Sequence, residues 1–547
     1  MTKNNCYNNF MGFVKKHLTT ILITTAMLLG LFIRIYKIDF GLPLIFIADE
    51  TDIYDEVIKF SLNYKFILRD GSINDFAPPT YVYGMFPTYF LTICTMILNK
   101  TASVFSFHID FHFYHIYLRL ITALFSLSIP IFSYLIYKEI FERSKGSLLA
   151  ILLVLFNWKL IVYSRYLNQD IYLTSLVTMS LFLFIKYLKS DKTRVKITYL
   201  ILSSVALGFA TGTKITALLS APMIIGVIIM RKRTKDVLPF IIGVILSFSI
   251  SNPFSIINFQ SFISRVIAMK TREAGAVFSS VNLNPLKYFY GLSNIMTPPV
   301  FMLGLITIIF LSIRFLKNKE LKKLETEEIT HIFLIGNIFI YILFFSLNKR
   351  LVERWVLPIT PIFIIYSAYG IYSLEKLVTS KHTQNILKIS LLLISFSFYA
   401  IYMLMFFKQL NIGDTRLSAY NWTINYLNQS QNKELKILVY TNKGRDPFAN
   451  IKNCDVQMFH VYESGDAENF RPKNPNDYDL VITYSDMEDN YKNSYVSEKY
   501  PDYTNSWINF EKEIDNTQNF LLLKSFETTK LDLMGLSNIY IYQKVSD

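Results

Sequence analysis

The chain has 547 residues, of which 52% are hydrophobic and 18% are charged, and its mean hydropathy is +0.32. A sequence this apolar is not a series of ordinary soluble domains, because much of its surface must lie in lipid. The net charge of +14 is uneven: residues 409–547 hold 14 Lys and Arg against 20 Asp and Glu, a net of −6, which leaves +20 for residues 1–408. The basic residues cluster at the ends of apolar runs, as in cytoplasmic loops of membrane proteins, so we expect no nucleic-acid partner.

The cysteines give no sign of redox or metal chemistry. Cys6, Cys94 and Cys454 are odd in number and far apart, which suits neither a disulfide framework nor a metal site. No compact set of carboxylates has the spacing of metal ligands. We therefore expect no bound metal and no required cofactor, although the sequence does not fix a metal requirement.

The apolar runs are roughly 17 to 23 residues long, enough to cross a bilayer as helices. The first run follows Lys15 and Lys16 and lacks a convincing cleavage site, so it is interpreted as a retained span. Basic connections at 138–146, 186–196, 231–235, 314–323 and 376–388 are placed in the cytoplasm. The eleven predicted spans are 17–38, 115–137, 147–163, 170–188, 197–212, 214–230, 236–252, 298–316, 329–347, 355–374 and 386–408.

Segment 86–105 is apolar enough for a further span, but that span would move the basic connection 138–146 to the outside. We interpret it as a re-entrant or surface-lying helix. The amino terminus is then cytoplasmic, and 39–114 and 253–297 are outer loops. Everything after residue 408 is extracytoplasmic. The predicted protein is a multi-pass protein of the plasma membrane.

Residues 409–547 differ in character from the rest of the chain. Short β-like runs at Lys436–Thr441, Asp479–Tyr484, Phe520–Phe526 and Ile539–Gln543 alternate with polar loops, and a helix is expected at Arg416–Leu427. The predicted fold class is an all-α polytopic membrane domain over 1–408, followed by a small extracytoplasmic α/β domain over 409–547. The tail shows no phosphate-binding glycine loop and no nucleophile elbow.

The first candidate for chemistry is the carboxylate pair Asp49 and Glu50, at the start of the first outer loop. A carboxylate held at a membrane surface suits a general base that deprotonates an acceptor hydroxyl. The alternative is that Asp49 caps an amphipathic helix.

A second candidate is the polar tip Tyr163 to Asp170 between two spans on the same outer face. Arg165 offers a guanidinium for phosphate oxygens, and Asp170 adds a carboxylate. The alternative is that Arg165 only extends toward the interface and Asp170 only caps a helix.

Cations on this outer face contradict the positive-inside trend and suggest an anion site. Lys214 ends the turn Gly208 to Lys214, where an ammonium suits an anionic head group, or else only extends to the interface. Arg350 and Arg354 surround Glu353 before a late span; the alternative there is a misassigned topology. All these candidates fall on one face, which predicts a water-filled cavity at the outer interface with carboxylates for an acceptor and cations for a phosphate.

At these residues the chain resembles the GT-C glycosyltransferases, in particular the branch with dolichyl-phosphate-mannose protein mannosyltransferases and lipid A aminoarabinose transferases. Ile47-Ala48-Asp49-Glu50 looks like the Asp-Glu pair of the first outer loop, and Ser164-Arg165-Tyr166-Leu167 through Asp170 looks like the Arg-Tyr hairpin. Gly208 to Lys214, Arg354 to Pro358 and Asp414 to Trp422 are similar to further motifs of that branch.

The resemblance implies an inverting transfer of a sugar from a polyprenyl-phosphate donor on the extracytoplasmic face, with no required metal. The predicted catalytic residues are then Asp49 as the base, Glu50 next to it, and Asp170, which assists or organises the loop. Lys214, Arg165, Arg350 and Arg354 would hold the donor phosphate. The acceptor is a protein, a lipid or a glycan, and membrane lipids surround the enzyme.

Two other functions stay open from the sequence. A lipid-linked sugar flippase also needs many spans and charged groups, but it predicts internal repeats and interrupted helices at mid-depth. A polysaccharide polymerase shares the topology but lacks the Asp-Glu opening loop. The charges at the outer boundary favour the transferase.

Overall fold

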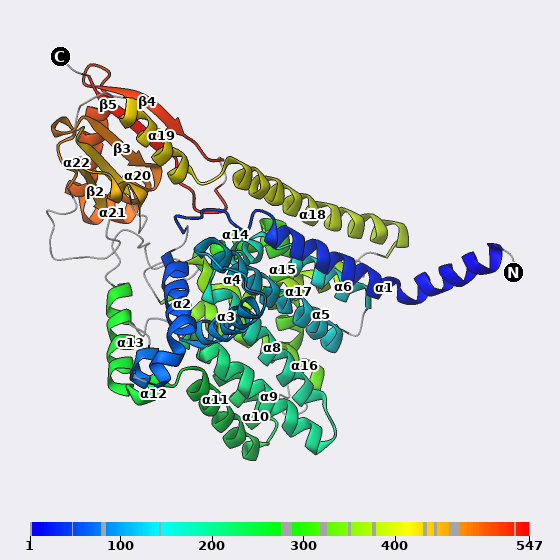
Figure 1. Ribbon diagram of the computed structural model, residues 1–547. Helices are drawn as coiled ribbons and strands as arrows, with labels where there is room; N and C mark the ends of the chain where they lie inside the picture. Colours follow the sequence, from blue (N-terminus) through cyan, green and yellow to red (C-terminus); the bar gives the residue numbers. More distant parts are fainter. Residues whose placement is uncertain are drawn as a thin grey trace.

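The computed structural model describes residues 3–45, 48–69, 71–77, 84–141, 144–274, 287–317, 325–347, 352–374, 379–429, 435–441, 446–458, 471–529 and 532–545. Figure 1 shows two parts, a large helical body and a small sheet domain at the carboxyl terminus. The helices up to residue 412 are α1 (Lys3–Ile35), α2 (Ala48–Arg69), α3 (Phe86–Val104), α4 (Phe111–Ser126), α5 (Ser128–Phe141), α6 (Ser144–Leu155), α7 (Trp158–Ser164), α8 (Gln169–Lys189), α9 (Thr193–Thr211), α10 (Ala221–Met230), α11 (Val237–Ser251), α12 (Phe254–Ile257), α13 (Phe259–Ala274), α14 (Lys287–Met296), α15 (Pro298–Lys317), α16 (Thr326–Ser346), α17 (Thr360–Leu374) and α18 (Lys381–Ile412).

Among the described residues, eight helical stretches are long and apolar enough to cross a membrane, or nine if a bent pair counts as one span. The bent pair is α6 with α7, which meet at 50°. Two shorter apolar helices, Ile215–Met230 and Pro298–Arg314, lie where two further spans were predicted. The predicted helical membrane fold is confirmed, and the chain is a multi-span integral membrane protein. The number of spans stays a prediction.

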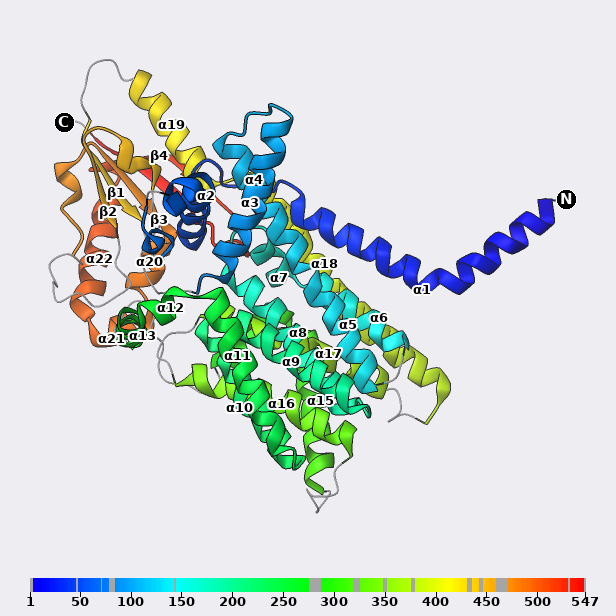
Figure 2. The same cartoon turned by 60° about the horizontal axis from the view of Figure 1, so that its bottom comes forward.

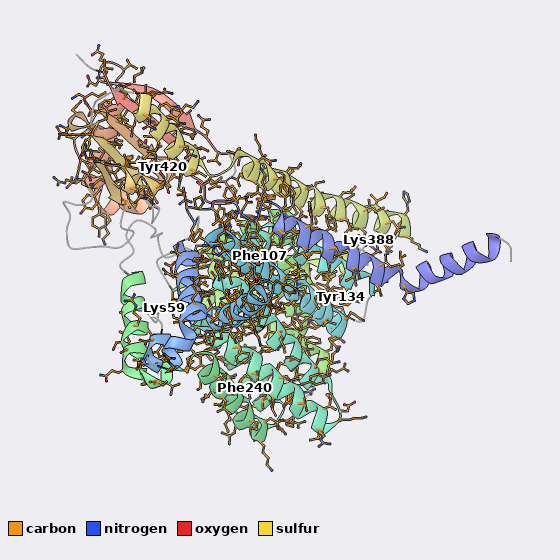
Figure 3. The ribbon with its side chains drawn as sticks, viewed as in Figure 1. Lys59, Phe107, Tyr134, Phe240, Lys388 and Tyr420 are labelled. Carbon is orange, nitrogen blue, oxygen red and sulfur yellow. The ribbon has the colours of Figure 1, made fainter. Side chains whose placement is uncertain are left out.

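Segment 86–105 forms α3, which is not among the spanning candidates and packs along α2. Figure 2 shows α2, α3 and α4 gathered at the end of the body next to the sheet domain, while α10, α11 and α16 extend away from it. In Figure 3, Lys388 of α18 lies far from the sheet domain that contains Tyr420. The end near the sheet domain is the end that was predicted to face outward.

Small residues let α9 and α11 pack closely. A Cβ on Gly208 would lie 1.8 Å from Ser247 Oγ, and one on Gly212 would lie 2.0 Å from Ser251 Oγ. Small residues four apart are typical of helix interfaces in membranes, because backbones can then approach each other. The two glycines of the turn before Lys214 are therefore packing residues that set where α9 ends.

The tail domain has five strands in the order β2-β1-β3-β5-β4. The inner strands β1 (Ile437–Thr441) and β3 (Leu480–Tyr484) are parallel and fully buried. The other strands are β2 (Cys454–Met458), parallel to β1, and β4 (Phe520–Phe526) and β5 (Ile539–Lys544), which are antiparallel to each other. The helices of the tail are α19 (Thr415–Gln429), α20 (Ser485–Tyr491), α21 (Ser494–Lys499) and α22 (Pro501–Ile514). The predicted α/β class is confirmed, and β2 was not predicted.

The segment between β4 and β5 docks the tail onto the membrane body. Leu533, Met534 and Leu536 are buried in one apolar cluster with residues of α1, α7 and α18. The buried side chain of Gln409, in α18, donates to Asp532 Oδ1 at 3.0 Å and accepts from the Leu533 backbone N–H at 3.1 Å. Apolar burial and a buried amide that is fully used on both sides hold the two parts together.

We expect Gln409→Ala to lower stability by about 1 to 3 kcal/mol, because it leaves the Leu533 N–H and the Asp532 carboxylate without their buried partner. The measurement is the thermal unfolding midpoint of the purified protein in detergent. Gln429→Ala, at the exposed end of α19, is the matched control and should change stability by less than about 0.5 kcal/mol. Equal midpoints for the two variants would contradict the docking role of Gln409.

Candidate active site

Four of the predicted residues meet in one charge cluster, which we define as Asp49, Arg354, Asp170 and Lys214. Arg354 Nη1 lies 2.5 Å from Asp49 Oδ2, and Arg354 Nε lies 3.6 Å from Asp170 Oδ2. Lys214 Nζ lies 2.9 Å from Asp170 Oδ1. Carboxylates and cations alternate along the cluster, so its formal charges cancel. Because ionisable groups at a membrane are costly unless paired or solvated, this arrangement is a candidate site.

The cluster is accessible at one end and enclosed at the other. The side chains of Asp49 and Arg354 are 22% and 24% exposed, whereas that of Asp170 is 4% exposed. The Asp170 carboxylate is therefore the inner anchor, and Asp49 and Arg354 form the part that a substrate can reach. This gradient suits a site in which Asp170 organises the cations and Asp49 meets an acceptor.

Asp49 lies in the first turn of α2, where a carboxylate also interacts favourably with the positive end of the helix dipole. Asp170 lies in the first turn of α8, but it is not the cap. The cap is Asn168, whose side chain accepts the Asp170 backbone N–H at 2.8 Å. The Asp170 carboxylate is thus available for Lys214 and Arg354.

The turn that carries Lys214 is held by the start of α3. Gly84 N–H donates to Thr213 O, and Phe86 N–H donates to Gly212 O, both at 3.0 Å. A Cβ on Gly84 would lie 1.9 Å from Gly212 O, so only glycine allows this approach. The Lys214 ammonium points to Asp170. Lys214 therefore does not only extend toward the membrane interface, which was the alternative for this residue.

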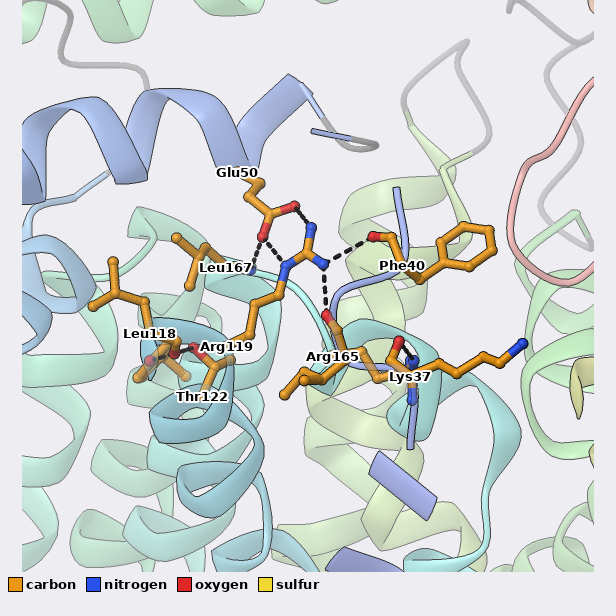
Figure 4. Close-up of polar contacts among 10 residues, drawn as sticks. Lys37, Phe40, Glu50, Leu118, Arg119, Thr122, Arg165 and Leu167 are labelled. Atoms are coloured by element: carbon orange, nitrogen blue, oxygen red, sulfur yellow. Dashed lines mark hydrogen bonds and ion pairs between the residues drawn. The ribbon is translucent and has the colours of Figure 1, made fainter. Parts of the chain in front are cut away.

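Glu50 does not join the cluster. Figure 4 shows its carboxylate in a two-pronged pair with Arg119 of α4, with contacts of 2.6 Å and 2.8 Å. Both side chains are fully buried. Arg119 also donates to the backbone carbonyls of Ile38 and Phe40. This pair ties α2 to α4 and to the segment after α1, so it has a structural place beside the site.

Arg165 also lies away from the cluster. Its guanidinium is buried and donates to the carbonyls of Ile33, Arg34 and Lys37 at the end of α1. Ile33 and Arg34 lie in the last turn of α1, where a helix leaves its carbonyls without partners in the helix, and Lys37 lies just after the helix, so Arg165 caps α1 and holds the segment after it. The guanidinium was predicted to bind phosphate, and the structure uses it for the backbone instead. Arg350 lies outside the described residues.

The sequence analysis missed a second ion pair next to the cluster. Lys159 Nζ of α7 lies 2.9 Å from Glu353 Oε2, and Asn294 Nδ2 donates to Glu353 Oε1 at 3.0 Å. Tyr163 has electrostatic interactions with Lys159, Glu353, Arg354 and Asp170, so it lies between the pair and the cluster. The sequence signal for this ion pair was Lys159 inside an apolar run, because a charged residue within a membrane span needs a partner.

Another carboxyl on α2 has an altered proton affinity. Burial, and after it the repulsion of Asp52, raises the pKa of Glu56 to about 7. This carboxyl also has a side-chain hydrogen bond with Thr88 of α3, so it lies between α2 and α3. Among the described residues, no three His, Cys, Asp or Glu side chains are grouped in a way that would hold a metal ion.

We expect Arg119→Met to lower stability by about 3 to 5 kcal/mol, since it leaves the Glu50 charge buried without its partner. The measurement is the yield and unfolding midpoint of the purified protein. Replacing both residues, Glu50→Gln with Arg119→Met, should restore part of the loss, because no charge is then left buried. Lys473→Met, which breaks an exposed pair with Asp455, should change stability by less than about 1 kcal/mol. A similar small effect for Arg119→Met would contradict the structural role.

Part of the chain is similar to a known protein family. Residues 24–269 match the family model described as dolichyl-phosphate-mannose-protein mannosyltransferase. A search of curated protein sequences finds no match. The matched region contains Asp49, Asp170 and Lys214, and Arg354 lies beyond it.

Solved structures agree at the level of the fold. ArnT from Cupriavidus metallidurans, bound to undecaprenyl phosphate, has a TM-score of 0.52 at 10% identity, over 95% of this chain and 97% of that one. Its apo state has a TM-score of 0.51 at 11% identity, over 96% and 98%. The archaeal oligosaccharyltransferase AglB from Archaeoglobus fulgidus has a TM-score of 0.44 at 12% identity, over 87% of this chain and 70% of that one.

The predicted resemblance to the protein mannosyltransferase and aminoarabinose transferase branch is confirmed by the family match and by the fold. Residues 24–269 carry the sequence signature of the dolichyl-phosphate-mannose-protein mannosyltransferases, and the chain has the fold of ArnT.

Proposed function

We propose that the protein transfers a sugar from a polyprenyl-phosphate carrier to an acceptor hydroxyl on the extracytoplasmic face of the plasma membrane. The observation that carries this proposal is the charge cluster, in which Arg354 contacts both Asp49 and Asp170. The ArnT structure with undecaprenyl phosphate supports a lipid phosphate as the donor group. The amino terminus would be cytoplasmic and the tail extracytoplasmic, and the acceptor would be a protein, a lipid or a glycan.

The cations would hold the donor phosphate. Arg354 has a planar guanidinium with several N–H donors, which matches phosphate oxygens, and Lys214 adds a point charge on the other side of Asp170. Arg354 is also the more exposed of the two. A donor phosphate that approaches from the accessible end would therefore meet Arg354 first and draw it from Asp49.

Asp49 would then act as the base. Its carboxylate takes the proton of the acceptor hydroxyl while the acceptor oxygen forms a bond to the anomeric carbon. The bond from that carbon to the phosphate oxygen breaks, and its electron pair leaves with the polyprenyl phosphate. Attack opposite to the leaving group inverts the anomeric configuration. Arg354 and Lys214 stabilise the negative charge that grows on the phosphate.

Glu50 and Arg165 would serve this reaction indirectly. Glu50 holds the first turn of α2 through Arg119, and Arg165 holds the end of α1. Both contacts limit how far Asp49 can move relative to α8. We also propose that the reaction requires no metal, because the two carboxylates of the cluster already have cationic side chains as partners.

We expect Asp49→Asn to reduce transfer by at least about 100-fold while binding of the donor persists, because the amide cannot accept the acceptor proton. Lys214→Ala should instead weaken both binding and transfer, since it removes a cation from the phosphate. The measurement is release of radiolabelled sugar from synthetic polyprenyl-phosphate donors by purified protein. Lys232→Ala, in the connection after α10, is a control that should retain wild-type rates. Unchanged transfer by Asp49→Asn would exclude Asp49 as the base.

We also expect transfer to survive removal of divalent metals by a chelator, with a rate within about twofold of the untreated enzyme. The reason is that cationic side chains supply the charge that a metal would supply at the phosphate. The same release assay, run with chelator and then with added manganese, measures this. Loss of activity in chelator followed by recovery with manganese would show that the enzyme needs a metal.

A further inference from the structure

The ion pair of Lys159 and Glu353 continues the charge cluster along the same edge of the protein. Glu353 directly precedes Arg354, so the two side chains start about 3.8 Å apart at their Cα atoms. Glu353 accepts from Lys159 with one oxygen and from Asn294 with the other. Three elements, α7, α14 and the turn Glu353–Ile359, thus bring an ammonium, a carboxylate and an amide together.

Accessibility separates this pair from the neighbouring pair of Glu50 and Arg119. The side chains of Lys159 and Glu353 are 14% and 25% exposed, whereas Glu50 and Arg119 are both fully buried. A pair that only ties helices together gains from exclusion of water, as the Glu50 pair does. The Lys159 pair keeps solvent contact beside Arg354, which is where a donor would lie.

Aromatic rings complete the surroundings of the pair. The Lys159 ammonium lies 4.6 Å from the ring centroid of Trp158 and 5.7 Å from that of Tyr163. Tyr163 interacts electrostatically with both members of the pair and with two members of the cluster. Aromatic side chains beside charged hydrogen-bonding groups can pack on apolar C–H surface while the polar groups bind hydroxyls.

A sugar ring fits this set of groups. Each hydroxyl can donate one hydrogen bond and accept others, so one hydroxyl can donate to the Glu353 carboxylate while its neighbour accepts from the Lys159 ammonium. A phosphate would instead be repelled by Glu353, and an apolar chain would leave the pair without polar contacts. The chemistry therefore favours the sugar over the other two parts of the donor.

We propose that Lys159, Glu353 and Asn294 form the subsite that binds hydroxyls of the donor sugar and selects which sugar is transferred. This inference rests on the proposed function, because the lipid phosphate on Arg354 and Lys214 is what brings the sugar to Glu353. The order of groups along the protein then follows the order in the donor: phosphate at the cations, anomeric carbon near Asp49, and ring hydroxyls at the Lys159 pair.

The experiment removes the hydroxyls one at a time. The purified full-length enzyme is given the polyprenyl-phosphate sugar that it transfers best and the monodeoxy analogues of that donor, and kcat/KM is measured for each. For the wild type, loss of a bound hydroxyl should reduce kcat/KM by about 10- to 100-fold, because a charged partner is left without its hydrogen bond. In Lys159→Met and in Glu353→Gln, the same analogue should lose less than about threefold, because the partner has already been weakened or removed.

The matched control is Lys186→Met. Lys186 pairs with Glu139 at 3.0 Å, with side-chain exposures of 31% and 26%, near the ends of α8 and α5 and away from the cluster. This variant loses a comparable Lys–Glu pair and should keep the wild-type penalty for every analogue. Inhibition by sugar-free polyprenyl phosphate checks the fold of each variant, since the phosphate site is intact in all of them.

Equal penalties in the wild type, Lys159→Met and Glu353→Gln for every analogue would overturn the subsite. Glu353→Gln keeps the size of the side chain and an oxygen for Asn294, so it gives the answer if Lys159→Met does not fold. A wild-type enzyme that releases sugar from no polyprenyl-phosphate donor would be a different result, because it contradicts the proposed function itself and the inference with it.

Discussion

The Asp170 carboxylate is the contact on which the arrangement of the site depends. It accepts from Lys214, after α9, and faces Arg354, at the start of the turn before α17. Through Arg354 it is connected to Asp49 on α2. One nearly buried anion therefore sets the distance between three segments that are far apart in the sequence. Without it, two cations would face each other at a membrane boundary, where like charges and poor solvation both oppose the fold.

A frame of buried arginines holds this centre in place. Arg119 joins Glu50 to the segment after α1, and Arg165 donates to two carbonyls in the last turn of α1 and to one just after it. Guanidinium groups suit this task because they offer several donors in a rigid plane. The tail adds a third support: its segment before β5 packs on α7, the helix that carries Lys159 and Tyr163. The tail domain thus packs on the same helix that carries the Lys159 pair.

Much of this could be predicted from the sequence. Apolar runs located the membrane helices, since their length follows from bilayer thickness, and short β-like runs between polar loops located four of the five strands. Carboxylates at the ends of predicted spans pointed to Asp49 and Asp170, and cations against the positive-inside trend pointed to Lys214 and Arg354, because such charges need a partner or a substrate. The β2 strand was not predicted, because Cys454–Met458 contains Asp and Gln among its five residues and so lacks the continuous run of β1 and β3.

The roles of neighbouring residues could not be predicted in the same way. Glu50 follows Asp49 by one residue, but a helix turns by about 100° between them, so one faces the cluster and the other faces Arg119. Lys159 and Glu353 are 194 residues apart, and no local pattern connects them. Arg165 was expected near a phosphate, and only the path of the chain after α1 shows that carbonyls take its donors. The tertiary fold determines which charged side chains pair with each other.

The balance of charge in the cluster bears on how the reaction would begin. Two carboxylates and two cations cancel, so a donor phosphate adds a net negative charge to the site. In the proposed reaction Arg354 turns from Asp49 to the phosphate, which releases the Asp49 carboxylate from this ion pair and lets it accept a hydrogen bond from the acceptor hydroxyl. Binding of the donor would therefore expose Asp49 at the moment when the acceptor hydroxyl must lose its proton. The ion pair of Asp49 and Arg354 would in this way couple donor binding to deprotonation of the acceptor.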